Sequence, residues 1–413
     1  MSVGIHWLLG GMLLGWAIMV AVISGVAIVR WRARRREPIG GARWWTRRHD
    51  PLGGSRVQAL PRVVVLRPCA GLEPHLQRSL ESTASLRYSG ALRVVLGTST
   101  AQDPACAVLR QVAADLRTQG LDVTVGVFGA RGANLKASQL AGMLDGTSDG
   151  IEDDIALVID SDVELEGLNL DRMLAPLRDP SVPTGAVWCP PVERQIHGLG
   201  DRMSAALLGG SLHAFTLLGA LDPHGLVGKT FAIRVDALRA IGGFDGLVQH
   251  LGEDMEIARR LRESGWQTAM SPAVVTSLAC RRGIRQVLGR YVRWLMVIRA
   301  QRPALLASYP LLLAATPGLL VASSIGLAFD LPGAGLALGL ALATRLMIGV
   351  VASAAARRSL RPAAVLADAL LADALLLAAF GRAAFGPTIV QWRGRSLQLG
   401  ARGRLEVIEA GTQ

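Results

Sequence analysis

Several residue types are scarce in this chain of 413 residues. Four cysteines are too few for a disulfide framework and too widely spaced for a paired-cysteine zinc site, so we expect reduced thiols at Cys69, Cys106, Cys189 and Cys280. Aromatic residues make up only 5%, and lysine occurs only at Lys136 and Lys229, although Lys and Arg together number 44. Arginine therefore carries nearly all of the positive charge.

Apolar residues, in contrast, are abundant. They make up 51% of the chain, and the mean hydropathy of +0.36 is too high for an ordinary soluble enzyme of this length. The net charge of +12 does not indicate a nucleic-acid partner, because the arginine clusters flank apolar runs instead of following a polar face. We expect a lipid bilayer as a partner and no nucleic acid.

The first apolar run, Ile5–Val29, contains no charged residue and has the length of a membrane-spanning helix. No positive residue precedes it, so a cleaved signal peptide is not expected. Ten arginines follow between Arg30 and Arg62, which places the next segment in the cytoplasm by the positive-inside rule. Tryptophans in this basic segment favour a position at the lipid headgroups, with a solvated linker as the alternative.

The middle of the chain has ordinary globular composition and alternates strand-like with helix-like stretches. The expected strands are Arg62–Leu66, Leu92–Leu96, Leu121–Phe128 and Asp154–Ile159, and the expected helices are Pro74–Ser85, Pro104–Arg117 and Asn134–Leu144. This alternation predicts an α/β fold with a mostly parallel sheet and helices on both faces. Ligands of such sheets bind beyond the carboxyl ends of the strands.

Near the C-terminus, Pro303–Phe329 and Pro332–Ala355 each suffice for a membrane span. A third run, Ala363–Phe380, carries Asp368 and Asp373 and precedes an arginine-rich tail. Because a third crossing would place that tail outside, we expect an interfacial or re-entrant helix. The predicted organisation is a transmembrane helix at 1–30, a basic linker at 31–60, a cytoplasmic α/β domain at 61–300, membrane segments at 301–386 and a basic cytoplasmic tail at 387–413.

Three motifs carry the chemistry. Asp160-Ser161-Asp162 directly follows an apolar strand, and two carboxylates at a strand end suit a divalent cation that also binds a diphosphate. A solvated acidic turn is the alternative. The second motif, Glu253-Asp254, opens the expected helix Met255–Glu263. A carboxylate at this position acts either as a general base or as a helix-capping group.

The third motif is Arg290-Tyr291-Val292-Arg293-Trp294, just ahead of an apolar run. On a helix, the two arginines and the tryptophan share one face, so that two guanidiniums and an indole can converge on a phosphorylated ligand. The alternative interpretation is a basic and aromatic belt beside the membrane.

In this order, the motifs resemble the D, D, D, (Q/R)xxRW pattern of GT-A-fold glycosyltransferases of families 2 and 21. The chain is most similar to the ceramide glucosyltransferases and the bacterial hopanoid-linked glycosyltransferases among them. Further matching stretches are Val65–Pro68 with Gly71 and Glu73, Asn134–Lys136, Gly228–Arg234, Ile241–Phe244 and Trp392–Gly394. The resemblance covers residues 61–300 and the membrane layout, and it implies a GT-A catalytic domain.

The resemblance also implies a role for each matched residue. Asp160 and Asp162 would bind Mg²⁺ or Mn²⁺ together with the diphosphate of a nucleotide sugar, and Asp254 would be the catalytic base. The other substrate-binding candidates are Asp103, Asn134, Lys136, Asp160, Lys229, Arg290, Arg293 and Trp294. One position departs from the family: Thr100 stands where an aspartate often opens this loop, so that only Asp103 remains to recognise the nucleotide base.

The implied reaction is an inverting transfer of a sugar from UDP-glucose, or a similar UDP-hexose, to a lipid hydroxyl at a bacterial inner membrane. Two alternatives stay open. A processive polysaccharide synthase shares the (Q/R)xxRW motif but needs a multi-helix channel, and a membrane scaffold would contain a degenerate, non-catalytic GT-A domain.

Overall fold

The computed structural model describes residues 3–36, 60–146, 154–210, 215–222, 225–278, 280–358, 361–392 and 395–407. Most of the predicted basic linker, with Trp44 and Trp45, lies outside these residues. The chain divides into two compact units. A helical unit comprises Met1–Arg32, Val192–Asp222 and Ala279–Val390, and a sheet unit comprises Ala33–Pro191, Pro223–Leu278 and Gln391–Gln413.

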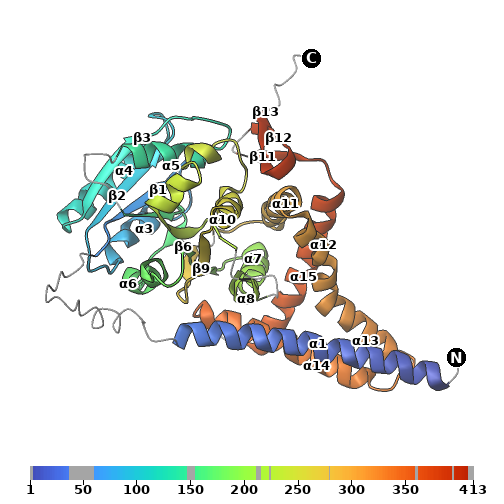
Figure 1. Ribbon diagram of the computed structural model, residues 1–413. Coiled ribbons are helices and arrows are strands. Elements are labelled where there is room, and N and C mark those ends of the chain that lie inside the picture. Colours follow the sequence, from blue (N-terminus) through green and yellow to red (C-terminus); the bar gives the residue numbers. More distant parts are fainter. Residues whose placement is uncertain are drawn as a thin grey trace, which may run out of the picture. The chain divides into compact units, whose positions relative to one another are not determined.

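A seven-stranded sheet with the order β3-β2-β1-β4-β8-β6-β9 forms the centre of the sheet unit (Figure 1). The strands are β1 (Val63–Pro68), β2 (Leu92–Thr98), β3 (Asp122–Val127), β4 (Ile155–Ile159), β6 (Thr184–Trp188), β8 (Thr230–Arg234) and β9 (Gln267–Met270). Neighbouring strands are parallel except where β8 pairs with β4 and β6. The predicted α/β fold with a mostly parallel sheet is therefore confirmed.

Helices cover both faces of this sheet. They are α3 (Leu76–Glu81) with the 3₁₀ turn η1 (Ser82–Ser85), α4 (Ala105–Thr118), α5 (Leu135–Asp145), α6 (Leu170–Met173) with η2 (Ala175–Arg178), α9 (Val235–Ala240), η3 (Asp245–Leu247) and α10 (Glu253–Glu263). Every strand and helix predicted between residues 62 and 159 is present, with small shifts of its ends. The periodicity of apolar residues was sufficient to place them.

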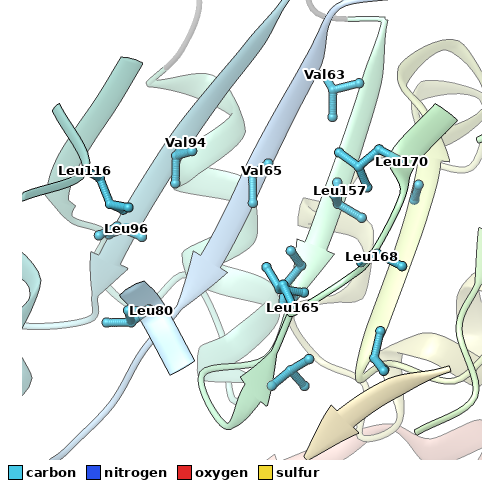
Figure 2. Packing of buried hydrophobic residues seen from close by; sticks show 14 of the residues in the cluster. Val63, Val65, Leu80, Val94, Leu96, Leu116, Leu157, Leu165, Leu168 and Leu170 are labelled. Atoms are coloured by element: carbon cyan, nitrogen blue, oxygen red, sulfur yellow. The ribbon is translucent and has the colours of Figure 1, made fainter. Parts of the chain in front are cut away.

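The central strands are apolar along their whole length because both of their faces are covered. All residues of β1 and β4 are buried. Figure 2 shows one face of this core. Val63 and Val65 of β1 lie on this face because alternate residues of a strand point the same way, and Val94 of β2 belongs to the same cluster. Leu80 of α3 and Leu116 of α4 pack against them. The core thus fixes the strand ends that carry the polar residues described below.

Short strands complete the sheet unit. β5 (Val163–Glu164) pairs antiparallel with β10 (Val275–Leu278), and the tail forms a sheet of β11 (Ile389–Trp392), β12 (Arg395–Leu399) and β13 (Leu405–Val407). The tail is bonded to the loop before α10: the Leu251 amide donates to the Gly403 carbonyl at 2.8 Å, and the Leu405 amide donates to the Gln249 carbonyl at 2.7 Å. The tail therefore folds as part of the same unit as α10.

The helical unit begins with α1 (Val3–Arg36) and continues after β7 (Pro191–Arg194) with α7 (Leu199–Gly210) and α8 (Phe215–Leu221). Its C-terminal part consists of α11 (Ile284–Gln301), α12 (Pro303–Leu313), the π-helical turn η4 (Ala314–Gly318), α13 (Leu319–Ala328), α14 (Ala334–Ala355) and α15 (Pro362–Phe385). Four stretches within the described residues are long and apolar enough to cross a membrane: Val3–Ala33, Pro303–Ala328, Ala334–Ala355 and Pro362–Phe385.

The last of these stretches is the one predicted to be interfacial or re-entrant. α15 is a continuous helix of 24 residues, so its length alone would permit a crossing. Both of its aspartates have partners: Asp368 pairs with Arg202 of α7 at 2.5 Å, and Asp373 pairs with Arg345 of α14 through contacts of 2.8 and 2.9 Å. Arg345 and Asp373 are buried, so a charge pair joins α14 to α15.

Replacing Asp373 by Leu is expected to destabilise this unit strongly, because Arg345 would remain buried without its carboxylate. Breaking a buried ion pair from one side costs about 3–5 kcal/mol, whereas exchanging both partners for apolar residues is often neutral. We expect the double variant Arg345→Met/Asp373→Leu to recover most of the lost stability. Thermal unfolding of the detergent-solubilised chain measures the stability of the single and the double variant. A double variant as unstable as the single one would show that loss of the ion pair is not the cause of the destabilisation.

Candidate active site

The turn Asp160-Ser161-Asp162 is fixed in place by a buried arginine. Arg67, at the carboxyl end of β1, donates to the carbonyl oxygens of Asp160 and Val163 at 3.2 and 2.7 Å, and also to the Ser79 carbonyl at 2.7 Å. Burial lowers the pKa of Arg67 to about 10, so the guanidinium stays charged at neutral pH. This side chain joins the end of β1 to the turn after β4.

A cavity opens at this turn, beyond the carboxyl ends of β1 and β4, as expected for a sheet of this type. The residues that line it end or follow β1, follow β4, belong to α5, or precede β8: Pro68, Glu73, Leu135, Lys136, Gln139, Asp160, Ser161, Asp162 and Lys229. Both lysines of the chain are among them. The structure thus brings together four of the site residues predicted from the sequence, Lys136, Asp160, Asp162 and Lys229.

The two lysines neutralise the two aspartates. Lys229 Nζ lies 2.6 and 2.5 Å from the two carboxylate oxygens of Asp162 and 3.6 Å from Asp160. Lys136 Nζ lies 2.7 Å from Asp160 and 3.0 Å from Glu253. Burial favours the neutral amine of Lys136, but these two carboxylates outweigh it and hold the pKa of Lys136 above its usual value. The cavity therefore contains two positive charges beside its carboxylates.

Glu73, Ser161 and Gln139 line the cavity but were not predicted as site residues. Glu73 accepts a hydrogen bond of 2.6 Å from the Ser161 hydroxyl, and burial raises the pKa of Glu73. The sequence held a signal for it, because Glu73 lies in the loop directly after the buried strand β1. Applying the strand-end rule to β1 as well as to β4 would have identified this residue.

Asp254 lies in the first turn of α10. This helix starts after Gly252, whose φ of 74° is in the left-handed region that glycine tolerates. The Asp254 carboxylate accepts hydrogen bonds from the Gly228 amide at 2.7 Å and from the Met255 amide at 2.9 Å. Burial and the neighbouring charge of Glu253 raise the pKa of Asp254 to about 6. A carboxylate with this pKa is poised to exchange a proton near neutral pH.

Five of the predicted substrate-binding residues are not among those that line the cavity: Asp103, Asn134, Arg290, Arg293 and Trp294. Asn134 caps α5 by accepting from the Ala137 amide at 3.0 Å, and its amide group donates to Glu253 at 3.2 Å. Asp103 accepts from the amides of Gly71 and Ala105, both at 2.9 Å. Asn134 thus orients Glu253, which in turn contacts Lys136, and Asp103 shapes the loop after β1.

The arginine and tryptophan motif belongs to α11 of the helical unit. Arg290 donates to the buried Glu193 at 3.0 Å and to the Ser204 hydroxyl. The Arg290 guanidinium lies 5.2 Å from the ring of Trp294, so these two residues share a face of the helix as predicted. Arg293 is half-buried on the same helix. Arg290 is therefore held by an internal acidic partner within this unit.

The paired aspartates and the two lysines beyond β1 and β4 agree with the site that the sequence motifs predict, and the chain also contains apolar helices. The chain belongs to glycosyl transferase family 21, whose family model matches residues 17–405. This assignment confirms the family resemblance found in the sequence.

Solved structures of other glycosyltransferases are similar to the chain at a greater distance. A mannosyltransferase from Pyrobaculum calidifontis, in complex with GDP-Man and Mn²⁺, is 20% identical over 90% of this chain and 99% of that chain, with a TM-score of 0.43. Glucosyl-3-phosphoglycerate synthase from Mycobacterium tuberculosis, in complex with Mn²⁺, UDP and its product, is 17% identical over 57% of this chain and 79% of that chain, with a TM-score of 0.34. The family assignment rests on the family model.

Proposed function

We propose that the chain transfers a hexose from a nucleotide sugar, UDP-glucose or a similar UDP-hexose, to the hydroxyl group of a membrane lipid with inversion at the anomeric carbon. The observation that carries this proposal is the cavity with Asp160, Asp162, Lys136 and Lys229, which joins through Glu253 to the helix that bears Asp254. The two lysines are cationic groups for a diphosphate, and Asp254 is a carboxylate for proton removal.

The donor set fits a divalent cation that is bound jointly with phosphate. Asp160 and Asp162 present hard carboxylate oxygens, and Mg²⁺ in such sites takes one or two carboxylates and completes its shell with substrate phosphates and water. No group of three or more His, Cys, Asp or Glu side chains suited to a metal occurs within the described residues. Mg²⁺ or Mn²⁺ at Asp160 and Asp162 would supply Lewis-acid stabilisation of the leaving diphosphate.

The chain's own residues complete the proposed mechanism. Lys136 and Lys229 attract the diphosphate and stabilise the charge that develops as it leaves. Asp254, ionised above its pKa of about 6, accepts the proton of the attacking hydroxyl. Its hydrogen bonds from Gly228 and Met255 fix the carboxylate in one orientation. The direct attack of the hydroxyl on the anomeric carbon gives inversion.

A lipid is the proposed acceptor because the arginine and tryptophan motif immediately precedes an apolar helix. Arg290, Arg293 and Trp294 lie on α11, and a single residue separates the end of α11 from the start of α12 at Pro303. Residues at this point are suited to contact a molecule that enters from the bilayer. Ceramide-like and hopanoid-like lipids both offer a hydroxyl group at the membrane surface, and we propose this class of acceptor at a bacterial inner membrane.

The topology that we propose places the sheet unit and the tail in the cytoplasm and the N-terminus outside. The tail is hydrogen-bonded to the loop before α10, so tail and sheet unit share one side. Crossings by α12–α13 and α14 already return the chain to that side, and α15 ends beside α11, where Arg299 donates to the Ala383 and Gly386 carbonyls. These contacts favour the predicted interfacial position of α15 over a further crossing.

Incubating membranes that contain the chain with radiolabelled UDP-hexoses and Mn²⁺ tests the proposed function. We expect label in a single lipid of discrete mobility after organic extraction, and none with membranes that lack the chain. Label in a high-molecular-weight polymer would instead identify a polysaccharide synthase. Neither transfer nor hydrolysis of any sugar nucleotide would identify a non-catalytic scaffold.

A further inference from the structure

The contact between Lys229 and Asp162 uses both oxygens of the carboxylate. The ammonium lies 2.6 Å from Oδ1 and 2.5 Å from Oδ2, and the Ser277 hydroxyl donates to Oδ2 at 3.0 Å. The two side chains are 17% and 26% exposed, so water screens the pair only in part. Lys229 thus lies where a cation that binds Asp162 would have to lie.

A metal ion and this ammonium compete for the same oxygens. A divalent cation that binds Asp162 has to displace Lys229, and the displaced positive charge would then remain in a partly buried cavity near the metal. At a distance of a few ångströms that repulsion weakens metal binding. A diphosphate reduces this repulsion, because its oxygens accept the ammonium.

Lys136 differs from Lys229 in this respect. Besides Asp160, it contacts Glu253 at 3.0 Å and donates to the Gly228 carbonyl at 3.0 Å. Those two contacts hold Lys136 in place when Asp160 changes its partner. The backbone of Lys229 is also fixed, because its carbonyl accepts from the Asp160 amide at 3.0 Å, so the exchange requires movement of the Lys229 side chain alone.

We propose that Lys229 is a resident counter-cation of Asp162, which competes with a divalent metal for this carboxylate and is displaced more easily when a nucleoside diphosphate is present to receive the ammonium. This inference rests on the proposed function. Metal and nucleotide therefore bind cooperatively, and by thermodynamic linkage each strengthens the binding of the other by the same factor. We therefore expect Mn²⁺ alone to bind weakly and Mn²⁺ together with the nucleotide to bind more tightly.

The test is Mn²⁺ binding to the detergent-solubilised full chain, measured by EPR of free Mn²⁺ with and without UDP. For the wild type we expect UDP to tighten Mn²⁺ binding at least about tenfold. Lys229→Met should bind Mn²⁺ alone about tenfold more tightly than the wild type, with a smaller effect of UDP, because the competing charge is gone. Lys229→Arg, which keeps the charge, should behave like the wild type.

Equal Mn²⁺ affinities of the wild type and Lys229→Met without UDP would overturn the proposal, provided that both unfold at similar temperatures. If Lys229→Met is unstable, Lys229→Gln replaces it in the same measurement. If the wild type transfers the sugar but binds Mn²⁺ and UDP independently of each other, this inference is overturned and the proposed function stays intact. Absence of Mn²⁺ binding in every state would contradict both the inference and the metal in the proposed function.

Discussion

Asp254→Asn is expected to lower kcat by roughly 10²–10⁴-fold, the contribution of a positioned general base. The asparagine retains one oxygen acceptor for the amides of Gly228 and Met255 and loses the other, at a cost of about 1–3 kcal/mol, so the chain should still fold. UDP binding should survive because the proposed diphosphate contacts are with Asp160, Asp162 and the lysines. Steady-state kinetics, UDP titration and thermal unfolding measure the three quantities.

The pH dependence provides a second readout of the same residue. Because a base works only when it is ionised and the pKa of Asp254 is about 6, kcat of the wild type should fall as the pH drops through 6. That acidic limb should be absent in Asp254→Asn. Glu263→Gln, an exposed carboxylate at the far end of α10, is the matched control and should leave turnover unchanged. Near-normal turnover of Asp254→Asn would make this carboxylate a structural residue.

Glu253 is a poor control for Asp254, although the two are neighbours in sequence. From the sequence, Glu253 is expected to point elsewhere, so that its loss should cost less than the loss of Asp254. In the structure its carboxylate is buried and contacts Lys136 at 3.0 Å and Asn134 at 3.2 Å. Burial opposes ionisation of Glu253, but Lys136 outweighs it and lowers the pKa of Glu253. Glu253→Gln would therefore disturb the donor site through Lys136.

Asp162→Asn is expected to abolish metal-stimulated transfer, with a loss of about 10³-fold or more, because a metal contributes several kcal/mol of charge stabilisation to the leaving phosphate. The change keeps the shape of the side chain but removes the charge that pairs with Lys229. Asp115→Asn, an exposed position on α4, is the control and should be neutral. Initial rates over a Mn²⁺ titration, with and without chelator, make the comparison. Full activity of Asp162→Asn in chelator would overturn the metal assignment.

The regular elements and the first carboxylates of the site could be predicted from the sequence. Apolar runs without interruption, such as Ile155–Ile159, require burial on both faces, and a strand of this kind places the following Asp160 at the ligand-binding edge of the sheet. Both steps depend only on local pattern and on general rules of sheet architecture. The buried strand and the position of Asp160 can therefore be predicted from the sequence alone.

The function of the remaining polar residues depends on contacts between distant parts of the chain. Asn134 and Glu253 are 119 residues apart in sequence, and only the folded chain shows that one orients the other. Likewise, the prediction that Arg290 contacts the donor did not include Glu193, the buried acid 97 residues away that it contacts in the structure. Pairing of this kind is decided by tertiary packing, which residue type and spacing do not encode.

The location of both lysines in one cavity has a practical consequence for the chemistry of the whole chain. Apart from the α-amino group, the only primary amines of the 413 residues line the proposed donor site, so an amine-specific acylating reagent would modify that site and the α-amino group. A lysine-specific endoprotease likewise has two bonds to cleave, one within α5 and one directly before β8. The folded chain should resist this protease, and the denatured chain should give three fragments. Lysine-directed digestion would therefore be an assay for the integrity of the proposed donor site.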